Sequence, residues 1–399
     1  MIVRTKLLLI YAFSWEDLMA EVSIIGAGII PFGKYYNRTL TDLASEAAYN
    51  AIRDAEIEKA KIQSGIFASS LASKLFGDIA VGQNVFWDVG INRIPIINVE
   101  NACTSGSTAF YLAYCLILSG QADYVLVVGA EKMCVEGFGL INSGQTELDT
   151  QLGLVAPVGF ALRAKRHMKE FGTTLEQMAQ VAVKNRRHAQ NNPIARFQKK
   201  ITVEEVLSSP MVTDPLTRLQ CCPIADGAAA VLLCSGSLAR QYSRAVNVET
   251  VGLFTGSYGN PQNLTQWETD YRACRIAYEK AGIGPEDLDV VECHDAFTIS
   301  EILHYEALNL CPIGEGGRLV NEGHTALGGS IPVNVSGGLL SKGHPLGATG
   351  VAQIVEIVTQ LRQEAGHRQV KEAKVGLAHC MGGDKAADAK SCTVAIFSV

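Results

Sequence analysis

Apolar positions in the first third of the chain follow two spacings. The run at 21–33 is apolar and closed by glycines, which predicts a buried β-strand, whereas apolar residues at 41–57 recur with helical spacing behind a threonine cap. A second strand is predicted at 94–100, a helix at 110–120 and a further strand at 122–133. Strands that alternate with helices indicate an α/β fold with parallel pairing through right-handed crossovers.

The later part of the chain repeats this pattern. Further elements are predicted as strands at 226–236, 247–257, 287–297, 374–380 and 391–399, and as a helix at 271–283. A run of small residues precedes a helix in each half, at 101–108 and at 343–350. This weak internal symmetry predicts a duplicated fold.

The segment between the halves has a different character, because it combines basic helical stretches at 162–172 and 174–190 with a break at Pro193. It is interpreted as an insertion over the core. The opening segment holds an apolar run at 6–13 that is too short to span a bilayer and lacks a cleavage site. The predicted divisions are an N-terminal extension at 1–20, a first half at 21–133 and 221–246, a loop domain at 134–220, and a second half at 247–399.

Composition narrows the class of function. Of the 399 residues, 48% are hydrophobic and 19% charged, and 38 are glycines, which is typical of a compact α/β enzyme. A net charge of −6 with scattered basic residues argues against nucleic acid as a partner. The 11 cysteines lack the spacing of disulfide frameworks or zinc sites, so we expect free thiols, no metal and a cytoplasmic location.

Cys103 is the first candidate for catalysis. It follows a predicted strand and precedes Thr104, Ser105 and Gly106 near the start of a predicted helix. Backbone N–H groups and the positive end of the helix dipole favour a thiolate there, which predicts a lowered thiol pKa and a nucleophile. The alternative is a small buried hydrophobic residue, the ordinary role of an intracellular cysteine.

Three further residues stand where catalytic groups are common. His344 lies in a glycine-rich segment beside Pro345 at a helix start, where it can accept a thiol proton or serve only as a cap. His294 and Cys380 each end a predicted strand, so His294 is interpreted as an oxyanion donor and Cys380 as a thiol that moves a proton. For both, a buried structural residue is the alternative.

Five sequence blocks occur in the order found in the thiolase superfamily: NACTSGSTAF, DGAAA, HDAF, NVSGGLLSKGHPLGATG and CMGG. The resemblance spans about residues 21–399, and the HDAF block is similar to the sterol carrier protein-type and archaeal branch. It implies an α/β thiolase fold, a duplicated five-layered α-β-α-β-α architecture with an inserted loop domain, in a dimer or tetramer. One departure concerns the second thiol, because this chain has Ala296 where some members have cysteine, and Cys380 where members often have asparagine.

The resemblance also implies a role for each site residue. His344 activates Cys103, which attacks the carbonyl and carries the acyl group, while Cys380 moves the α-proton of an acyl-CoA. One oxyanion hole is implied at His344 with a water held by His294, and a second at the amides of Cys103 and Gly382. The implied activity is thiolytic cleavage of a 3-oxoacyl-CoA or the reverse Claisen condensation.

Coenzyme A is expected as a substrate, with no other cofactor. Its phosphates need cations, so contacts are expected at Arg163, Arg196 and Lys199 of the insertion, and also at Ser336 and Gly337 of the glycine-rich block. Relatives of this branch imply a small partner subunit built of a zinc ribbon and an OB fold.

Three other functions stay open at this stage. A decarboxylating ketoacyl synthase also uses a helix-start cysteine but needs no second thiol, so Cys380 speaks against it. A retro-aldolase of the same superfamily needs no acyl-cysteine, so the presence of Cys103 speaks against that activity. A non-catalytic lipid-binding or acyl-CoA-binding subunit would tolerate loss of these groups, yet all are present.

Overall fold

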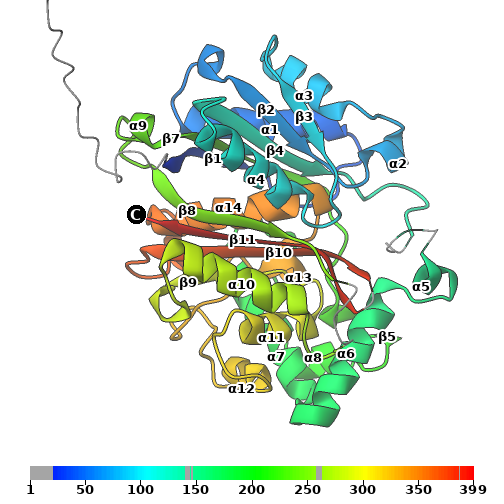
Figure 1. The fold of residues 1–399 in the computed structure, drawn as a ribbon. Coiled ribbons are helices and arrows are strands. Elements are labelled where there is room, and N and C mark those ends of the chain that lie inside the picture. Colours follow the sequence, from blue (N-terminus) through cyan, green and yellow to red (C-terminus); the bar gives the residue numbers. More distant parts are fainter. Residues whose placement is uncertain (1–20, 140–143, 145–146, 258–262, 386) are drawn as a thin grey trace, which may run out of the picture.

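The computed structural model describes residues 21–139, 144, 147–257, 263–385 and 387–399, so the predicted extension at 1–20 lies outside the described residues. The strands of its main sheet are β1 (Val22–Ile29), β2 (Ser64–Ala68), β3 (Ile96–Val99), β4 (Tyr124–Glu131), β7 (Gly227–Ser235), β8 (Val246–Phe254), β9 (Val290–Glu292), β10 (Val375–Lys385) and β11 (Asp388–Ser398). They form one nine-stranded sheet in the order β3-β2-β4-β7-β1-β8-β11-β10-β9 (Figure 1).

This sheet consists of two halves with the same topology. The order β2-β4-β7-β1 in the first half corresponds to β9-β10-β11-β8 in the second, and corresponding neighbours share the same relative direction. The halves meet at β1 and β8, where Ser23 pairs with Asn247 and Ile24 with Val246. The duplicated fold predicted from the repeated apolar pattern is therefore confirmed.

Parallel pairing, which the sequence predicted, holds for only part of the sheet. β2 is parallel to β3 and β4, and β9 to β10, but β7 runs antiparallel to β1 and β4, and β11 runs antiparallel to β8 and β10. β10 and β11 form a hairpin in which Lys385 pairs with Asp388, a connection too short for the crossover that parallel strands require. Apolar spacing identifies strands, but it does not give their direction.

The two halves of the sheet form two layers, and helices lie between them and on their outer faces, which gives five layers (Figure 1). The helices are α1 (Leu40–Asp54), α2 (Ala72–Phe76), α3 (Val81–Val89), α4 (Ser105–Leu118), α5 (Leu148–Gln151), α6 (Ala156–Phe171), α7 (Leu175–Ala189), α8 (Val203–Leu207), α9 (Gly236–Ala239), α10 (Glu268–Ala281), α11 (Thr298–Ala307), α12 (Gly316–Asn321), α13 (Gly338–Lys342) and α14 (Leu346–Leu361). α4 and α14 lie between the two halves of the sheet, α1 and α3 cover the outer face of the first half, and α10 and α11 cover the outer face of the second. The predicted α-β-α-β-α layers are confirmed.

Several element boundaries differ from the predictions. α1 begins at Leu40 because Thr39 caps it, in a capping box with Asp42. The strand expected at 287–297 ends at Glu292, so His294 lies in the segment that follows β9. The strand expected at 374–380 continues to Lys385 as β10, so Cys380 lies within that strand and does not end it.

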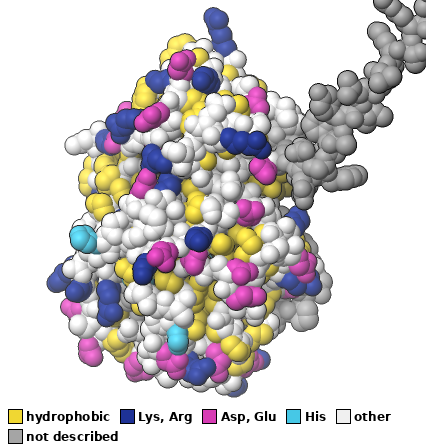
Figure 2. All heavy atoms as spheres, turned by 90° about the vertical axis from the view of Figure 1, so that its left-hand side faces the viewer, with side chains coloured by type: hydrophobic (Ala, Val, Ile, Leu, Met, Phe, Trp, Pro, Cys, Tyr) yellow, Lys and Arg dark blue, Asp and Glu magenta, His cyan; other side chains and the backbone are white. Residues whose placement is uncertain are grey.

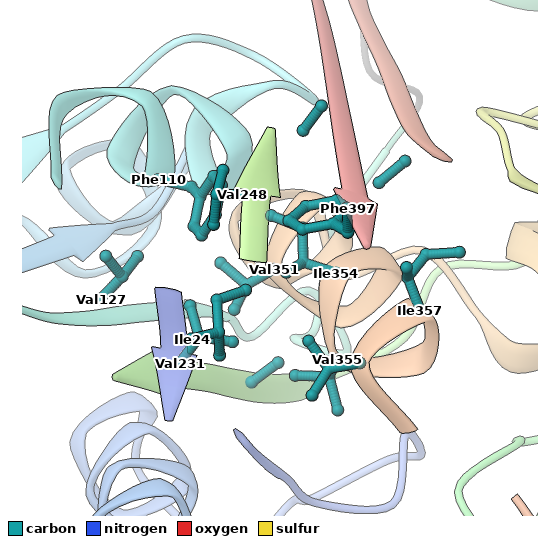
Figure 3. Close-up of a cluster of buried hydrophobic side chains, with 14 of the residues drawn as sticks. Ile24, Phe110, Val127, Val231, Val248, Val351, Ile354, Val355, Ile357 and Phe397 are labelled. Atoms are coloured by element: carbon teal, nitrogen blue, oxygen red, sulfur yellow. The ribbon is translucent and has the colours of Figure 1, made fainter. Parts of the chain in front are cut away.

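The middle layer holds a core that both halves share (Figure 3). Phe110 of α4 and Phe397 of β11 have ring centroids 5.9 Å apart, and Val351 and Ile354 of α14 belong to the same cluster. Almost every side chain of α14 is buried. A helix that is buried on all sides needs neighbours on all sides, which explains its place between the two halves.

Glycines let α4 and α14 approach closely at their starts. A Cβ on Gly106 would lie 2.5 Å from the carbonyl oxygen of Gly347, and one on Gly350 would lie 2.6 Å from the amide nitrogen of Ser107. Any side chain there would push the helices apart. The two small-residue runs therefore bring together the helix starts and the residues just before them.

The predicted insertion is largely helical and packs on the second half. It contains α5 to α8 and a small hairpin of β5 (Met211–Thr213) and β6 (Leu216–Thr217), and α7 contacts α11, α12 and α13. Thr174 caps α7 in a capping box with Gln177.

The surface shows mixed charge on the face drawn in Figure 2, where Lys and Arg side chains alternate with Asp and Glu. That distribution agrees with the scattered basic residues of the sequence. Among the helices of the described ranges, none is long and apolar enough to cross a membrane.

Candidate active site

The turn before α4 presents the predicted nucleophile. Cys103 precedes Thr104, the N-cap residue of α4, and Ala102 has a left-handed φ of 47°. The Ser105 hydroxyl donates to the Ala102 carbonyl oxygen at 2.7 Å. A left-handed alanine is unfavourable by itself, so the surrounding contacts fix the turn that positions the Cys103 sulfur.

His344 faces that sulfur. Its Nε2 lies 3.3 Å from Cys103 Sγ, and its Nδ1 lies 2.8 Å from Thr349 Oγ1. The Thr349 hydroxyl donates to the Pro345 carbonyl oxygen at 2.9 Å, so its oxygen accepts from the Nδ1–H group of His344. This fixes the tautomer in which Nε2 carries a lone pair toward Cys103, as a general base requires.

Burial keeps both groups uncharged. It raises the pKa of the Cys103 thiol to about 12 and lowers the pKa of His344 to about 3. The Gly383 amide lowers the Cys103 pKa and the carboxylate of Glu131 raises it, but burial is the larger cause. The predicted lowering of this thiol pKa was wrong, because desolvation outweighs the helix start. The resting pair is a thiol and a neutral imidazole.

His294 adds a second imidazole. Its ring lies edge-on to that of His344 with centroids 5.2 Å apart, and the residue is only 3% exposed. Neither ring nitrogen of His294 has a hydrogen-bond partner among the described residues. Buried polar atoms in proteins ordinarily have partners, so a bound water or ligand group is expected at these nitrogens.

Cys380 reaches the same point from β10. Its Sγ donates to the Cys103 carbonyl oxygen at 3.2 Å, and burial raises the pKa of its thiol well above the ordinary value. Gly382 lies against the nucleophile turn, since a Cβ there would lie 3.1 Å from the Cys103 amide nitrogen. The structure thus brings together Cys103, His294, His344 and Cys380 beside the backbone of Gly382.

Glu131, which the sequence did not single out, anchors the start of α14. Its buried carboxylate accepts from the amides of Gly347 at 3.0 Å, Ser70 at 2.7 Å and Leu71 at 3.2 Å. These bonds tie the end of β4 and the loop after β2 to the segment that carries His344. The partners come from distant parts of the chain, so no local sequence pattern could have revealed them.

A carboxylate and two imidazoles lie behind the site, fully buried. Asp270 Oδ2 lies 2.6 Å from Nδ1 of His304, and its Oδ1 lies 2.9 Å from Nε2 of His379. Burial alone would raise the pKa of Asp270, but the two imidazoles lower it far below its ordinary value. Nε2 of His304 donates to the His294 carbonyl oxygen at 3.1 Å. Asp270 therefore links the His294 segment to His379, the neighbour of Cys380.

Three residues predicted to contact coenzyme A are buried or lie in a tight turn. Arg163 is 1% exposed, and its guanidinium pairs with Asp384 at 3.2 Å. Ser336 is buried and donates to Glu292 at 2.6 Å, while Gly337 has a φ of 98° in a turn without room for a side chain. Their contacts with coenzyme A stay predictions, and residue type and position in a motif did not reveal their burial.

The contacts expected at Arg196 and Lys199 stay predictions. Lys199 is exposed, and the guanidinium of Arg196 lies 4.9 Å from the ring centroid of Phe197. The Arg196 amide donates to the Lys342 carbonyl oxygen at 3.2 Å, close to His344 in the chain. This segment therefore borders the loop that carries His344.

Two family models together cover most of the chain. The model described as thiolase, N-terminal domain matches residues 22–237, and the one described as thiolase C-terminal domain-like matches residues 255–396.

Curated relatives match over nearly the whole chain. The acetyl-CoA acetyltransferase of Methanothermobacter thermautotrophicus is 40% identical over 371 residues, which cover 92% of this chain and 97% of that one. Sterol carrier protein 2 of Bos taurus is 41% identical over 393 residues, with 92% and 71% covered. The benzoylsuccinyl-CoA thiolase subunit BbsB of Thauera aromatica is 37% identical over 374 residues, with 92% and 96% covered.

Solved structures share the fold. The Ltp2-ChsH2(DUF35) aldolase is similar with a TM-score of 0.79 at 24% identity, with 94% of this chain and 97% of that chain covered. Human mitochondrial 3-ketoacyl-CoA thiolase in complex with CoA has a TM-score of 0.74 at 20% identity, with 96% and 99% covered. Likeness at such identity concerns the fold alone. On the family models and the curated relatives, the chain belongs to the thiolase family and is an acyltransferase.

Proposed function

We propose that this chain catalyses the CoA-dependent thiolytic cleavage of a 3-oxoacyl-CoA, and the reverse Claisen condensation, with the acyl group carried on Cys103. The observation that carries the proposal is the 3.3 Å approach of His344 Nε2 to Cys103 Sγ, with the tautomer fixed by Thr349. The acetyl-CoA acetyltransferase and thiolase among the relatives support an acyl-CoA substrate.

The first half-reaction forms the acyl-enzyme. His344 Nε2 takes the thiol proton as the Cys103 sulfur attacks the 3-oxo carbon of the substrate. The C2–C3 bond then breaks, the shortened acyl group stays on the sulfur, and the departing enolate of acetyl-CoA takes a proton from Cys380. The Cys380 thiol suits this role because its sulfur lies 3.2 Å from the Cys103 carbonyl oxygen.

The second half-reaction restores the thiol protons of Cys380 and Cys103. Free CoA gives its thiol proton to the Cys380 thiolate and attacks the acyl carbon on Cys103. Collapse of that intermediate releases Cys103 as a thiolate, which recovers its proton from the His344 imidazolium. Condensation is the same sequence in reverse, with Cys380 removing the α-proton of acetyl-CoA.

Negative charge develops on a substrate oxygen in both half-reactions, so hydrogen-bond donors to that oxygen are required. The unpartnered nitrogens of His294 support a role in holding a water or donating directly to the enolate oxygen, beside His344. Gly382 lies beside the Cys103 amide, and the backbone N–H groups of these two residues are proposed as the oxyanion hole for the tetrahedral intermediate. Burial makes each such hydrogen bond stronger than it would be in water.

Retro-aldol cleavage is a second candidate, supported by the fold likeness to the Ltp2-ChsH2(DUF35) aldolase. Aldol cleavage needs no acyl-carrying thiol, however, and the Cys103–His344 pair favours the thiolase. The same aldolase is a precedent for a partner, and we propose that a small subunit binds this chain. Full activity of the chain purified alone would contradict the need for that subunit.

The test of the proposed function is a thiolysis assay over a panel of 3-oxoacyl-CoAs of short, long, branched and aromatic acyl groups. Wild type should cleave at least one of them in the presence of CoA. Cys103→Ser should lose acyl transfer, whereas Cys380→Ser should accept an acyl group but lose carbon–carbon cleavage. Cleavage unaffected by Cys103→Ser would overturn the acyl-enzyme mechanism.

A further inference from the structure

Three potential metal ligands converge at the active site. Cys103 Sγ, His344 Nε2 and a ring nitrogen of His294 all lie within 4.8 Å of one another, and the first two are 3.3 Å apart. In a tetrahedral zinc site with Zn–S near 2.3 Å and Zn–N near 2.0–2.1 Å, a sulfur and a nitrogen ligand stand about 3.5 Å apart. The Cys103–His344 pair therefore already has nearly the spacing that zinc imposes.

The lone pairs of this set are free to bind a cation. Thr349 accepts from Nδ1–H of His344, which leaves Nε2 as a lone-pair donor and fixes the ring plane, the same support that zinc-ligating histidines receive in proteins. Both ring nitrogens of His294 lack partners among the described residues, although the residue is 3% exposed. A buried imidazole without hydrogen-bond partners has ring nitrogens that are available to bind a metal ion.

Charge around the set also suits a cation. The Glu131 carboxylate is buried and close enough for its negative charge to act on Cys103. A zinc ion with one thiolate and two neutral imidazoles carries one net positive charge, which Glu131 offsets. Cys103 itself is only partly buried, so the set is not sealed from solvent.

We propose that Cys103, His294 and His344 bind a zinc ion reversibly, as an inhibitor and not as a resident cofactor. Binding releases the Cys103 thiol proton to solvent and leaves the fourth position of the ion to a water. The inhibitory consequence rests on the proposed function, because a sulfur bound to zinc cannot attack an acyl carbon.

A second group of potential ligands, Asp270, His379 and Cys392, carries no such inference. The Nε2 atom of His379 already lies 2.9 Å from Asp270 and 3.5 Å from Cys392 Sγ, and all three residues are fully buried. The Nε2 atom of His379 is thus already engaged within the group, whereas neither ring nitrogen of His294 has a partner among the described residues. This group supplies a matched control.

The test is a titration of the metal-free, full-length protein with Zn²⁺ against a chromophoric chelator, repeated with Co²⁺ to detect thiolate coordination by its absorption. Wild type should bind one Zn²⁺ per chain at this site, and His294→Ala or His294→Asn should weaken binding about 10–100-fold. Cys103→Ser should lose the thiolate–Co²⁺ absorption, and Cys392→Ser should bind as wild type does. Two variants of His294 are used so that one can still test the site if the other does not fold.

Each result bears on a different claim. Failure of wild type to bind Zn²⁺, or unchanged binding in Cys103→Ser and both His294 variants, would overturn the zinc site. Zinc binding through these residues without thiolysis of any 3-oxoacyl-CoA would leave the site standing while the proposed function fails. Thiolysis that continues in the zinc-loaded enzyme would overturn the inhibitory role alone.

Discussion

At the scale of single residues, the proposed mechanism depends on which nitrogen of His344 carries the proton. The sequence placed His344 in a glycine-rich helix start and left open whether it acts as a base or a cap. The structure supplies what the motif lacks, because Thr349 accepts from Nδ1–H and so points the Nε2 lone pair at Cys103. Thr349 is one helical turn into α14, and its role depends on side-chain geometry that residue order does not encode.

Replacing Thr349 by valine should lower kcat for thiolysis about 10–100-fold with little change in KM, because His344 loses the acceptor that fixes its tautomer. Steady-state kinetics measure both constants. Thr349→Ser should restore most of the rate. Thr359→Val is the matched control, since the Thr359 hydroxyl donates to a backbone carbonyl of the same helix far from the site. Equal kinetics in Thr349→Val and wild type would refute the role of Thr349.

Alkylation should report the protonation of Cys103. Because burial raises the thiol pKa to about 12 and lowers that of His344 to about 3, the resting enzyme holds little thiolate near neutral pH. The rate of Cys103 modification by iodoacetamide, followed by peptide mass spectrometry, should rise steadily from about pH 6 to about pH 9. A plateau that begins below neutral pH would indicate a resting thiolate–imidazolium pair and contradict this account.

At the scale of elements, the site is built where two helix starts meet. The small residues at 101–108 and 343–350 predicted a duplicated fold, and the structure shows that Gly106, Gly347 and Gly350 also let the two helix starts come into close contact. The supports behind the site were not predictable in the same way. Asp270 lies in the first turn of α10, whereas His304 and His379 lie on α11 and β10, so only the tertiary fold brings the three residues together.

Asp270→Asn should reduce the free energy of unfolding by about 3 kcal/mol, because two buried imidazoles lose their shared carboxylate. Since His304 holds the His294 carbonyl and His379 precedes Cys380, kcat for carbon–carbon cleavage should fall as well. Chemical denaturation and thiolysis kinetics measure the two effects. Asp88→Asn, at an exposed position, is the control. Unchanged stability of Asp270→Asn would show that the network contributes nothing to the fold.

At the scale of the whole molecule, the two halves share one core and the insertion is tied to the second half. The repeated apolar pattern was sufficient to predict the duplication, whereas the layers were implied by the resemblance to the thiolase superfamily. The pattern could not give strand direction, because antiparallel and parallel strands have the same apolar spacing. Nor could it reveal that Arg163 is buried, since a charged residue can be buried when a partner such as Asp384 lies within reach.

Acid should weaken the tie between the insertion and the second half. His188 of α7 donates from Nδ1 to the Asn334 carbonyl oxygen and accepts from the Leu327 amide at Nε2, and burial lowers its pKa to about 3. Below the ordinary histidine pKa of about 6.5, His188 binds a proton in the unfolded chain but not in the folded chain. The contribution of His188 to the free energy of unfolding is therefore complete above pH 6.5 and is lost as the pH falls. The loss reaches about 2 kcal/mol by pH 5.

The variant His188→Gln should therefore have a lower free energy of unfolding than wild type at neutral pH. This difference in free energy between variant and wild type should be smaller by about 2 kcal/mol at pH 5. Denaturant titrations at several pH values measure it, with His367→Gln at an exposed position as the control. A difference that stays constant with pH would show that His188 titrates alike in the folded and unfolded chain.

The central claim, that Cys103 carries the acyl group, is tested most directly by mass spectrometry of enzyme quenched during reaction with a 3-oxoacyl-CoA in the absence of free CoA. Peptide mapping should locate one acyl group on Cys103, and added CoA should remove it. Cys103→Ser should show no such adduct, while Cys380→Ser should be acylated from a simple acyl-CoA. Turnover of the substrate with no acyl group on Cys103, or with the acyl group on another residue, would contradict the account.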